Sequence, residues 1–406
     1  MNFSSENAKG GTPVSGLISS DTTWDLAGHP YWVEDDVILE EGVTLTIEPG
    51  VWVKFDGDHS IYVEGNLIAI GSETSRINIT SNKTYKNPRD WDRIQINSTG
   101  HAEVKYCNIS YGSYGLYLDS SLNNNIANNN VSNNMFGVYL DSSSNINITN
   151  NNVSNNHWGI FLTWFSSNNY IVNNNISSNT DEGINLELSS NNNNISNNNI
   201  SNNGDGIYLD YSFNNNITNN NLSNNYYGIY LKESNNNIIN NNILLNNHVG
   251  IHFYLYSSNN IIANNNILNN NYIGIRLMEF SSGNTITKNN VSNKDKLGIV
   301  ISRSSNINIT NNNLTNDGVF LDGDKLSEYN THTIPDNNKV NGKPLYYYKD
   351  SNGMNIDGIE AGQVILANCR NVNVTNLQIN NTDLGIEVAY SLNINITNNT
   401  VSNNDL

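Results

Sequence analysis

Rings and carboxylates recur at fixed places in a repeated segment, and they are the side chains best placed to do chemistry in this sequence. Two residues after a recurrent glycine, six of seven successive repeats carry an aromatic or imidazole ring. Rings with a polar tip suit a half-wet surface and can contact the apolar CH faces of sugars. We therefore predict a ligand-binding face for glycan or protein. Its ring residues are Tyr117, Tyr139, Phe161, Tyr208, Tyr230 and His252.

Carboxylates follow these rings two residues later in several repeats. The acids at this position are Asp119, Asp141, Glu187 and Asp210. A stack of acids could bind calcium. Thr163 and Lys232 interrupt the series, which favours a solvated acidic edge, so we predict no metal site. Asp119, Asp141 and Asp210 join the rings as candidate ligand-binding residues, and the alternative is that the rings only stack on one another and stiffen the sheet.

One tripeptide, Asn179-Thr180-Asp181, resembles an element of polygalacturonase-type β-helix enzymes. Those enzymes also need further acids on adjacent coils, with Gly-His-Gly and Arg-Ile-Lys motifs, and none of these follows here. The same tripeptide recurs at 381–383, so the repeat itself generates it. The Asp-Pro-His-Asp signature of alginate epimerases is missing. We assign no catalytic residue, and a polysaccharide-active lyase, hydrolase or epimerase stays open as the alternative.

Metal-ligating side chains do not converge in the sequence. His157 and His248 share one position of the repeat but lie four repeats apart, and Met135 lies one repeat from His157. A copper site needs several His, Met or Cys ligands together, so we predict no cofactor. Cys107 and Cys369 are 262 residues apart, too far for a disulfide in a stacked fold, and are expected as buried free thiols.

Composition excludes several classes of partner. Among 406 residues, Lys+Arg number 19 and Asp+Glu 37, and the net charge of −18 argues against nucleic acid and anionic membranes. No apolar run approaches the ~20 residues of a membrane span, and no secretion signal is visible at the start. Asparagine accounts for 91 residues while lysine is scarce, so the asparagine is expected to be structural.

The fold follows from the repeat. A glycine followed by Ile, Leu or Val recurs ten times from Gly115 to Gly318, mostly 22 to 24 residues apart. Alternating apolar residues after it, such as Ile160 and Leu162, predict a short strand buried on one face, and two more strand-sized segments fill each repeat. One coil cannot bury its own Ile residues, so coils must stack into parallel sheets. We predict an all-β fold, a right-handed single-stranded parallel β-helix of about 15 coils.

Asparagine has a predicted place at the corners of the coils. Two apolar residues five apart occur in each repeat, for example Ile238 with Ile243. Three residues after the first of the pair comes an asparagine, as at Asn151 and Asn241. Stacked amides can hydrogen-bond along the column, and asparagine tolerates left-handed backbone. We therefore predict an asparagine ladder.

The segments of the predicted single solenoid differ in regularity. They are a polar lead-in and N-terminal cap at 1–34, irregular first coils at 35–110, regular repeats at 111–322, a loop interruption at 323–352 and C-terminal coils at 353–406. The last period stops before its glycine strand, so we expect an uncapped C-terminal coil. Either the chain is a fragment, or this coil stacks end to end on another molecule.

Three stretches resemble the NosD-type right-handed parallel β-helix repeat proteins, which are abundant among surface proteins of methanogenic archaea. They include Glu41-Gly42-Val43-Thr44-Leu45, Gly206-Ile207-Tyr208-Leu209 and Val340-Asn341-Gly342-Lys343-Pro344. The resemblance implies the fold and a cell-surface or extracellular location, and with about twenty Asn-x-Ser/Thr sequons it implies a glycoprotein. The family takes its name from a periplasmic protein of copper delivery, so a copper-delivery accessory role is a lesser alternative. The broader superfamily includes sugar-active lyases, hydrolases and epimerases.

These observations favour a non-catalytic extracellular or cell-surface scaffold. We predict that it presents its aromatic and acidic face to a polysaccharide or to another surface protein, and that it has no cofactor, nucleic-acid partner or membrane span.

Overall fold

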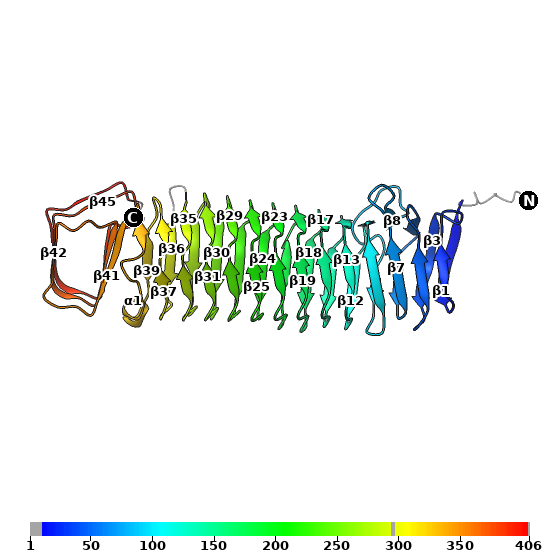
Figure 1. The fold of residues 1–406 in the computed structure, drawn as a ribbon, viewed down its shortest axis with the longest axis horizontal. Helices are drawn as coiled ribbons and strands as arrows, with labels where there is room; N and C mark the ends of the chain where they lie inside the picture. The colour runs from blue at the N-terminus through cyan, green and yellow to red at the C-terminus, as the bar shows by residue number, and fades with distance from the viewer. Residues whose placement is uncertain (1–9, 294–296, 405–406) are drawn as a thin grey trace, which may run out of the picture. The chain divides into compact units, whose positions relative to one another are not determined.

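The structure is a computed structural model that describes residues 10–293 and 297–404. The chain forms two compact units, Met1–Asn185 and Leu186–Leu406, each built from short strands (Figure 1). In the described ranges the only helix is α1 (Ser327–Asn330). The predicted all-β parallel solenoid is confirmed, with about 18 turns instead of about 15. With four residues, α1 is far too short for a membrane span, and the described ranges contain no helix that could form one.

In the first unit the strands lie in three columns, and each strand pairs in parallel with its counterpart one turn on. The first column contains β2 (Thr22–Trp24), β4 (Thr44–Ile47), β7 (Asn66–Ile70), β10 (His101–Lys105), β13 (Asn125–Ala127), β16 (Asn147–Thr149) and β19 (Tyr170–Val172). The second contains β5 (Trp52–Phe55), β8 (Ile77–Ser81), β11 (Cys107–Ser110), β14 (Asn130–Ser132), β17 (Asn152–Ser154) and β20 (Asn175–Ser177). The third contains β6 (Ile61–Val63), β9 (Ile94–Ile96), β12 (Tyr114–Asp119), β15 (Phe136–Asp141) and β18 (Trp158–Thr163).

Parallel pairing begins early in the first unit. β1 (Thr12–Ile18) pairs in parallel with β3 (Tyr31–Leu39), which pairs with both β5 and β6. These contacts start inside the segment 1–34 that was predicted as lead-in and cap. The strand β21 (Ile184–Leu186) spans the division between the units.

The second unit has the same three columns up to β40. The first column contains β22 (Asn194–Ser196), β25 (Asn216–Thr218), β28 (Ile238–Asn240), β31 (Ile261–Ala263), β34 (Thr285–Thr287) and β37 (Asn308–Thr310). The second contains β23 (Asn199–Ser201), β26 (Asn221–Ser223), β29 (Ile243–Leu245), β32 (Asn266–Leu268), β35 (Asn290–Ser292), β38 (Asn313–Leu314) and β40 (Lys339–Val340). The third contains β24 (Asp205–Asp210), β27 (Tyr227–Lys232), β30 (Val249–Tyr254), β33 (Ile273–Leu277), β36 (Leu297–Ser302) and β39 (Val319–Asp322).

Like residues stack on like residues in the interior, as the repeat predicts. Ile126 pairs with Ile148, which pairs with Ile171, and all three are buried. In the second unit Ile195 pairs with Ile217 in the same way. Each strand thus places alternate side chains in a core that several turns build together.

Buried asparagines form ladders at the corners, which confirms that prediction. The side-chain nitrogen of Asn220 donates to Oδ1 of Asn242 (3.1 Å), and that of Asn242 donates to Oδ1 of Asn265 (3.1 Å). The residue before each ladder member has left-handed backbone, for example Asn241 with φ 56°. Further ladders run through 215–237–260 and 225–247–270. Three corners per turn, each with two asparagines, explain why this residue dominates the composition.

The register predicted around residues 238–243 is wrong by one residue. Ile238 and Ile243 are exposed by 42% and 43%, and the apolar residue that follows each takes the buried place. Accordingly Asn242, and not Asn241, is the ladder residue. Two adjacent apolar residues fit either alternation, so the local pattern could not decide between them.

The repeated glycine lies where successive turns approach most closely. A Cβ atom at Gly228 would lie 2.6 Å from the carbonyl oxygen of Gly250 and 2.8 Å from Cδ2 of Leu244. A Cβ atom at Gly137 would lie 2.5 Å from the carbonyl oxygen of Gly159. A backbone carbonyl held in a sheet cannot move aside, so close stacking of the third column requires glycine.

We expect Gly228→Ala to destabilise the second unit by about 1–3 kcal/mol, because the added methyl group overpacks this contact. The midpoint of urea unfolding should fall relative to wild type. In the control Asn221→Ala, an exposed side chain of the same turn is shortened and the midpoint should barely change. Equal midpoints for the two variants would contradict the close approach.

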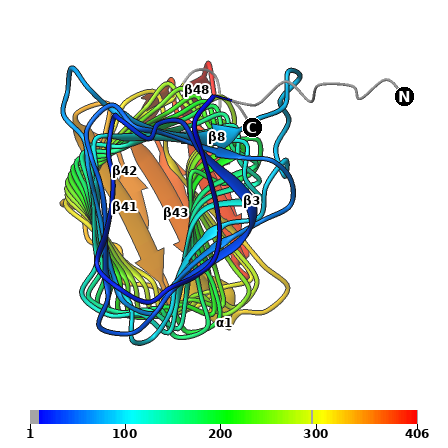
Figure 2. The same ribbon diagram turned by 90° about the vertical axis from the view of Figure 1, so that its right-hand side faces the viewer.

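The last turns of the second unit change direction. β40 pairs in parallel with β38 but antiparallel with β41 (Lys343–Lys349), so the predicted loop interruption at 323–352 contains a helix and two strands. The turns that follow contain β42 (Asn355–Asp357), β43 (Gln363–Ala367), β44 (Arg370–Thr375), β45 (Gln378–Asn380), β46 (Ile386–Ala389), β47 (Leu392–Thr397) and β48 (Thr400–Ser402). Figure 1 shows these turns end-on while the turns before β39 in the same unit are seen from the side, and Figure 2 shows β41 and β43 from the side.

Side chains of these last turns cover the free edge of β39. The backbone N–H of Val319 donates to Oε1 of Gln363 (2.9 Å), whose Nε2 donates back to the Val319 carbonyl. The N–H of Leu321 donates to Oε2 of Glu387 (3.3 Å). The chain turns at β40 and places no strand next to this edge of β39. Side-chain amide and carboxyl groups therefore bind the backbone groups of the edge instead.

Candidate functional site

The first unit carries a double column of aromatic rings on the outer side of β12, β15 and β18. One ring directly precedes each repeat glycine and another follows two residues after it, which gives two rings per turn over three turns. All six side chains are partly exposed. We call this set the ring array; its members are Tyr114, Tyr117, Phe136, Tyr139, Trp158 and Phe161.

The rings of the array pack closely along and across the columns. Phe136 stacks on Trp158 with 4.6 Å between centroids and an interplanar angle of 11°. In the other column Tyr139 stacks on Phe161 at 5.3 Å. Phe136 also meets Tyr139 edge-on at 5.1 Å. This ring-on-ring packing holds the outer faces at fixed positions, and the partial exposure leaves part of each ring open to solvent.

Charged side chains border the array. Asp119 and Asp141 lie in register on the outer side of their strands, beside the Tyr117 column. The Tyr117 hydroxyl lies 3.5 Å from Oδ2 of Asp141. The guanidinium group of Arg93 lies over the rings of Tyr114 (4.7 Å) and Tyr117 (5.0 Å). The array thus has carboxylates along one side and a cation at one end.

The second unit repeats the pattern with fewer rings. Tyr208, Tyr230 and His252 lie in register on successive turns, and Arg276 occupies the same position one turn later. The Tyr208 and Tyr230 rings lie 5.0 Å apart and are half-buried. The His252 side chain is only 4% exposed, so it packs against its neighbours and has little contact with solvent.

Burial and neighbouring acids keep the polar groups of both faces uncharged. Burial, with Asp119 and Asp141, raises the pKa of Tyr117 to about 12. Burial and Asp210 raise the pKa of Tyr208 well above its usual value. Burial and the Arg276 cation lower the pKa of His252 to about 4. At neutral pH the phenols therefore stay protonated, and the buried His252 imidazole is uncharged.

Asp210 is held by its own neighbours. Its Oδ2 accepts hydrogen bonds from the Tyr208 hydroxyl (3.2 Å) and from the Lys232 ammonium (2.9 Å). Lys232 stands where the earlier turns have an acid, so the acidic edge of the second unit is partly neutralised at this point.

Sequence reasoning found one column of the array and missed the other. Tyr114 and Phe136 were not singled out, although the position before the repeat glycine recurs with the same spacing. Arg276 continues the Tyr208 column, and the ring pattern in the sequence does not predict it because Arg276 carries no ring. Comparison of every position of the repeat across turns, without regard to strand alternation, identifies all three.

The two Asn-Thr-Asp tripeptides have local structural roles. Oδ2 of Asp181 lies 3.3 Å from Nε2 of His157. In the second tripeptide Asp383 is fully buried and accepts a hydrogen bond from the N–H of Gly298 (2.8 Å). Neither contact brings a second carboxylate to the position that glycoside hydrolysis requires.

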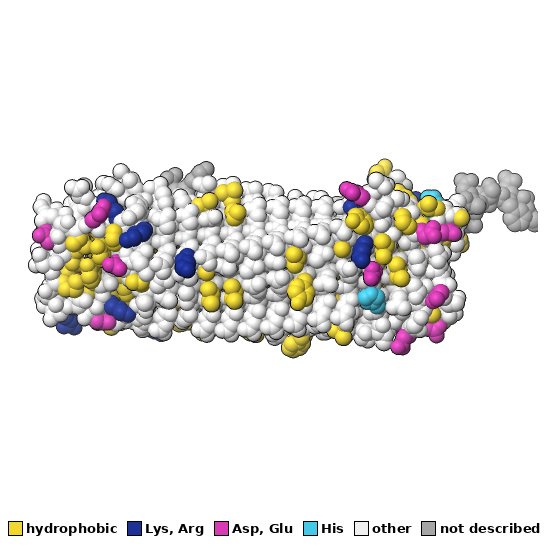
Figure 3. Space-filling model, viewed as in Figure 1, with side chains coloured by type: hydrophobic (Ala, Val, Ile, Leu, Met, Phe, Trp, Pro, Cys, Tyr) yellow, Lys and Arg dark blue, Asp and Glu magenta, His cyan; other side chains and the backbone are white. Residues whose placement is uncertain are grey.

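Most of the surface seen in Figure 3 is white, the colour of the backbone and of side chains that are neither hydrophobic nor charged nor histidine, and hydrophobic side chains appear there in separate groups. This agrees with outward positions filled mainly by asparagine, serine and threonine along the strands.

Two family models match the chain. Residues 75–253 match the family described as "Periplasmic copper-binding protein (NosD)". Residues 193–340 match the family described as "Right handed beta helix region". The second match confirms the predicted handedness of the solenoid.

Individual proteins give weaker likenesses. A segment of 72 residues is 38% identical to the protein bark beetle of Drosophila melanogaster, and it covers 18% of this chain and 2% of that protein. Among solved structures, the Azotobacter vinelandii mannuronan C-5 epimerase AlgE4 A-module is 12% identical (TM-score 0.42, 91% of both chains). The pre-mature bacteriophage phi29 gene product 12 is 12% identical (TM-score 0.49, 91% of this chain and 63% of that one). With TM-scores below 0.5, neither likeness says anything about the activity of this chain.

The residues present do not fit a copper site. Within the described ranges, one group of three His, Cys, Asp or Glu side chains has its ligand atoms within 4.8 Å of one another, namely Asp35, Asp36 and His59. Two carboxylates and one imidazole form a hard, oxygen-rich set, whereas copper sites use His, Met and Cys. Cys107 and Cys369 are buried free thiols, as predicted, and burial raises the pKa of Cys107 to about 12. A thiol held protonated in the core is a poor metal ligand.

Proposed function

Because this chain is a NosD-type right-handed β-helix repeat protein, we propose that it is a non-catalytic scaffold that binds polysaccharide through the ring array. Its proposed location is the cell surface or the extracellular space; the matching family is described as periplasmic, which is also outside the cytoplasm.

The observation that carries this proposal is the double column of partly exposed rings. Phe136, Tyr139, Trp158 and Phe161 present ring faces and edges on consecutive turns, and strands of neighbouring turns are about 4.8 Å apart. A sugar chain lying across the turns would place its CH faces on the rings. Its hydroxyl groups would reach the carboxylates of Asp119 and Asp141 alongside.

The electrostatics of the array support binding without catalysis. A tyrosine that acts as a general base must lose its proton near neutral pH. The raised pKa of Tyr117 keeps its phenol protonated and available as a hydrogen-bond donor. Tyr208 and Tyr230 of the second unit have raised pKa values for the same reason, which is burial.

We expect Tyr139→Ala/Phe161→Ala to weaken polysaccharide binding on a glycan array by about tenfold or more, because two central rings are lost. Tyr208→Ala/Tyr230→Ala tests the second unit in the same way. Tyr170→Ala removes an exposed ring from β19, outside the array, and should leave binding unchanged.

Circular dichroism of each variant checks that the β-helix is retained. Unchanged binding by the first double variant would reject the array as the binding face. Shortening or chemical change of the bound polysaccharide would contradict the non-catalytic part of the proposal.

A further inference from the structure

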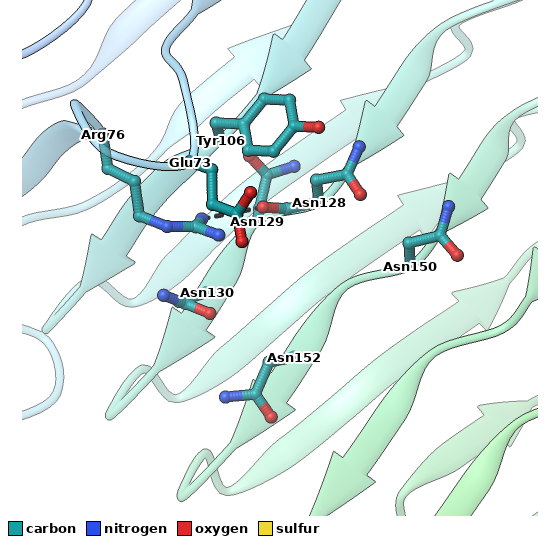
Figure 4. A pocket seen from close by; sticks show the side chains of 8 residues that line it. All are labelled: Glu73, Arg76, Tyr106, Asn128, Asn129, Asn130, Asn150 and Asn152. Carbon is teal, nitrogen blue, oxygen red and sulfur yellow. Dashed lines mark hydrogen bonds between the residues drawn. The ribbon is translucent and has the colours of Figure 1, made fainter.

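A hollow of about 270 Å³ lies in the first unit at the corner before β14 and β17, away from the ring array. Figure 4 shows side chains from several turns around it. Most of them are polar. The hollow is lined by Glu73, Arg76, Tyr106, Asn128, Asn130 and Asn152, with Asn129 and Asn150.

Arg76 forms one wall by reaching across a whole turn. Its Nη1 donates to the carbonyl oxygen of Asn128 (2.7 Å), and its guanidinium group lies 5.6 Å from the centre of the Tyr106 ring. Tyr106 occupies the left-handed corner position that Asn128 and Asn150 occupy on the next two turns. One guanidinium nitrogen is used in this contact, and the others remain for a ligand.

The outer amide ladder is interrupted at this hollow. On the outer side of the second column, the amide of Asn108 donates to Asn78, and that of Asn130 donates to Asn108, both at 2.8 Å. The amide of Asn175 donates to Asn152 at 2.9 Å. Within the described ranges no such bond joins Asn152 to Asn130. An amide donor and an amide acceptor that are paired elsewhere in the column are therefore open at the hollow.

We infer that this hollow binds a single neutral sugar residue. Its volume is slightly below the range of pockets for drug-sized ligands, which suits one pyranose ring. Sugar hydroxyl groups both donate and accept, and the walls offer a carboxylate acceptor (Glu73), a guanidinium donor (Arg76) and amides that do both. An anionic ligand would meet the Glu73 carboxylate, and a cationic ligand would meet Arg76, so a neutral polyol fits the charge pattern best. This inference does not rest on the proposed function of the ring array.

The test is saturation-transfer NMR on the full chain with methyl glycosides of glucose, galactose, mannose and N-acetylglucosamine, each up to about 50 mM. Glucuronate and sulfate are tested in the same way as anionic ligands. We expect at least one neutral glycoside to bind, and Glu73→Gln and Asn152→Ala, both at exposed positions, to weaken it by about fivefold or more. Arg76→Lys should weaken binding as well, because a lysine lacks the planar fork.

Two controls separate the hollow from other effects. Asn313→Ala removes the same type of outer amide from the second unit, where Asn313 donates to Asn290 at 3.0 Å, and should leave binding unchanged. Tyr139→Ala/Phe161→Ala disrupts the ring array and serves as a second background: Glu73→Gln added to it should still weaken the remaining glycoside binding, which distinguishes this site from the ring array. Binding of the anions alone, binding of no glycoside, or equal binding by the hollow variants and wild type would each overturn the inference.

Discussion

Replacing Asn242 by alanine should destabilise the second unit by about 2–6 kcal/mol, one of the largest single effects expected in this protein. The buried Asn242 carbonyl oxygen accepts from the backbone N–H of Asn220 (2.9 Å), and its nitrogen donates to the carbonyl oxygen of Ile217 (2.9 Å). Alanine would leave both backbone groups without a partner in a corner closed to water. Each such group costs about 1–3 kcal/mol.

The measurement is urea unfolding together with amide hydrogen exchange, because a solenoid can open locally before it unfolds globally. Exchange at the Asn220 amide should accelerate in Asn242→Ala. The matched control is Asn241→Ala, which places alanine in the left-handed conformation of the corner (φ 56°) and should cost only about 1–2 kcal/mol. If Asn241→Ala proved the more damaging change, the register seen in the structure would be wrong and the one expected from the sequence would be right.

Asn241 and Asn242 also show which feature of the fold the sequence pattern does not determine. The repeat predicts the columns because a coil that cannot bury its own apolar residues must stack, and Ile126, Ile148 and Ile171 do stack. Within one turn, the pattern of apolar residues does not always show which residue is buried. Where two apolar residues stand side by side, as at Ile238 and Ile239, only the position of the left-handed corner fixes which one points inward.

The ring array was half predictable for a related reason. Tyr117, Tyr139 and Phe161 follow the glycine by two residues, where strand alternation alone places them outside. Tyr114 and Phe136 precede the glycine, and the backbone there departs from simple alternation, since the glycine and the residue after it are both buried. Period two, counted back from the buried residues after the glycine, therefore places that position inside and does not predict an exposed ring there.

The period of the repeat could not predict that side chains cover the edge of β39. The side chains that do it come from residues 44 and 66 positions further along the chain, in turns that follow a reversal of direction. The composition of those turns looks like that of ordinary coils. What marks them is a buried polar set, Gln363 with Asp383 and Glu387.

Glu387 makes this closure sensitive to pH. Its side chain is buried against β39, and its Oε2 accepts from the N–H of Leu321. Burial, aided by Asp322 of β39, raises its pKa from 4.5 to about 8. The other titratable groups that interact with it electrostatically are the phenols of Tyr329 in α1 and Tyr347 in β41. The hydrogen bond from the N–H of Leu321 favours the ionised carboxylate, but burial and the Asp322 charge outweigh it, so the pKa of Glu387 is raised.

We therefore expect the second unit to lose stability as the pH rises from about 4.5 to about 8. The unfolded chain gives up the Glu387 proton near pH 4.5 and the folded chain only near pH 8, so the folded state is penalised increasingly across this window. A difference of about 3.5 between the two pKa values corresponds to about 4–5 kcal/mol at the alkaline end.

Glu387→Gln keeps an acceptor for Leu321 but cannot ionise, so it should be more stable than wild type at pH 9 and about equal to it at pH 4. Urea unfolding at both pH values measures this, with Glu360→Gln, an exposed acid of the same turns, as the control. Identical pH dependence in wild type and Glu387→Gln would show that the carboxyl is hydrated in the folded protein and that β39 is closed without a protonated acid.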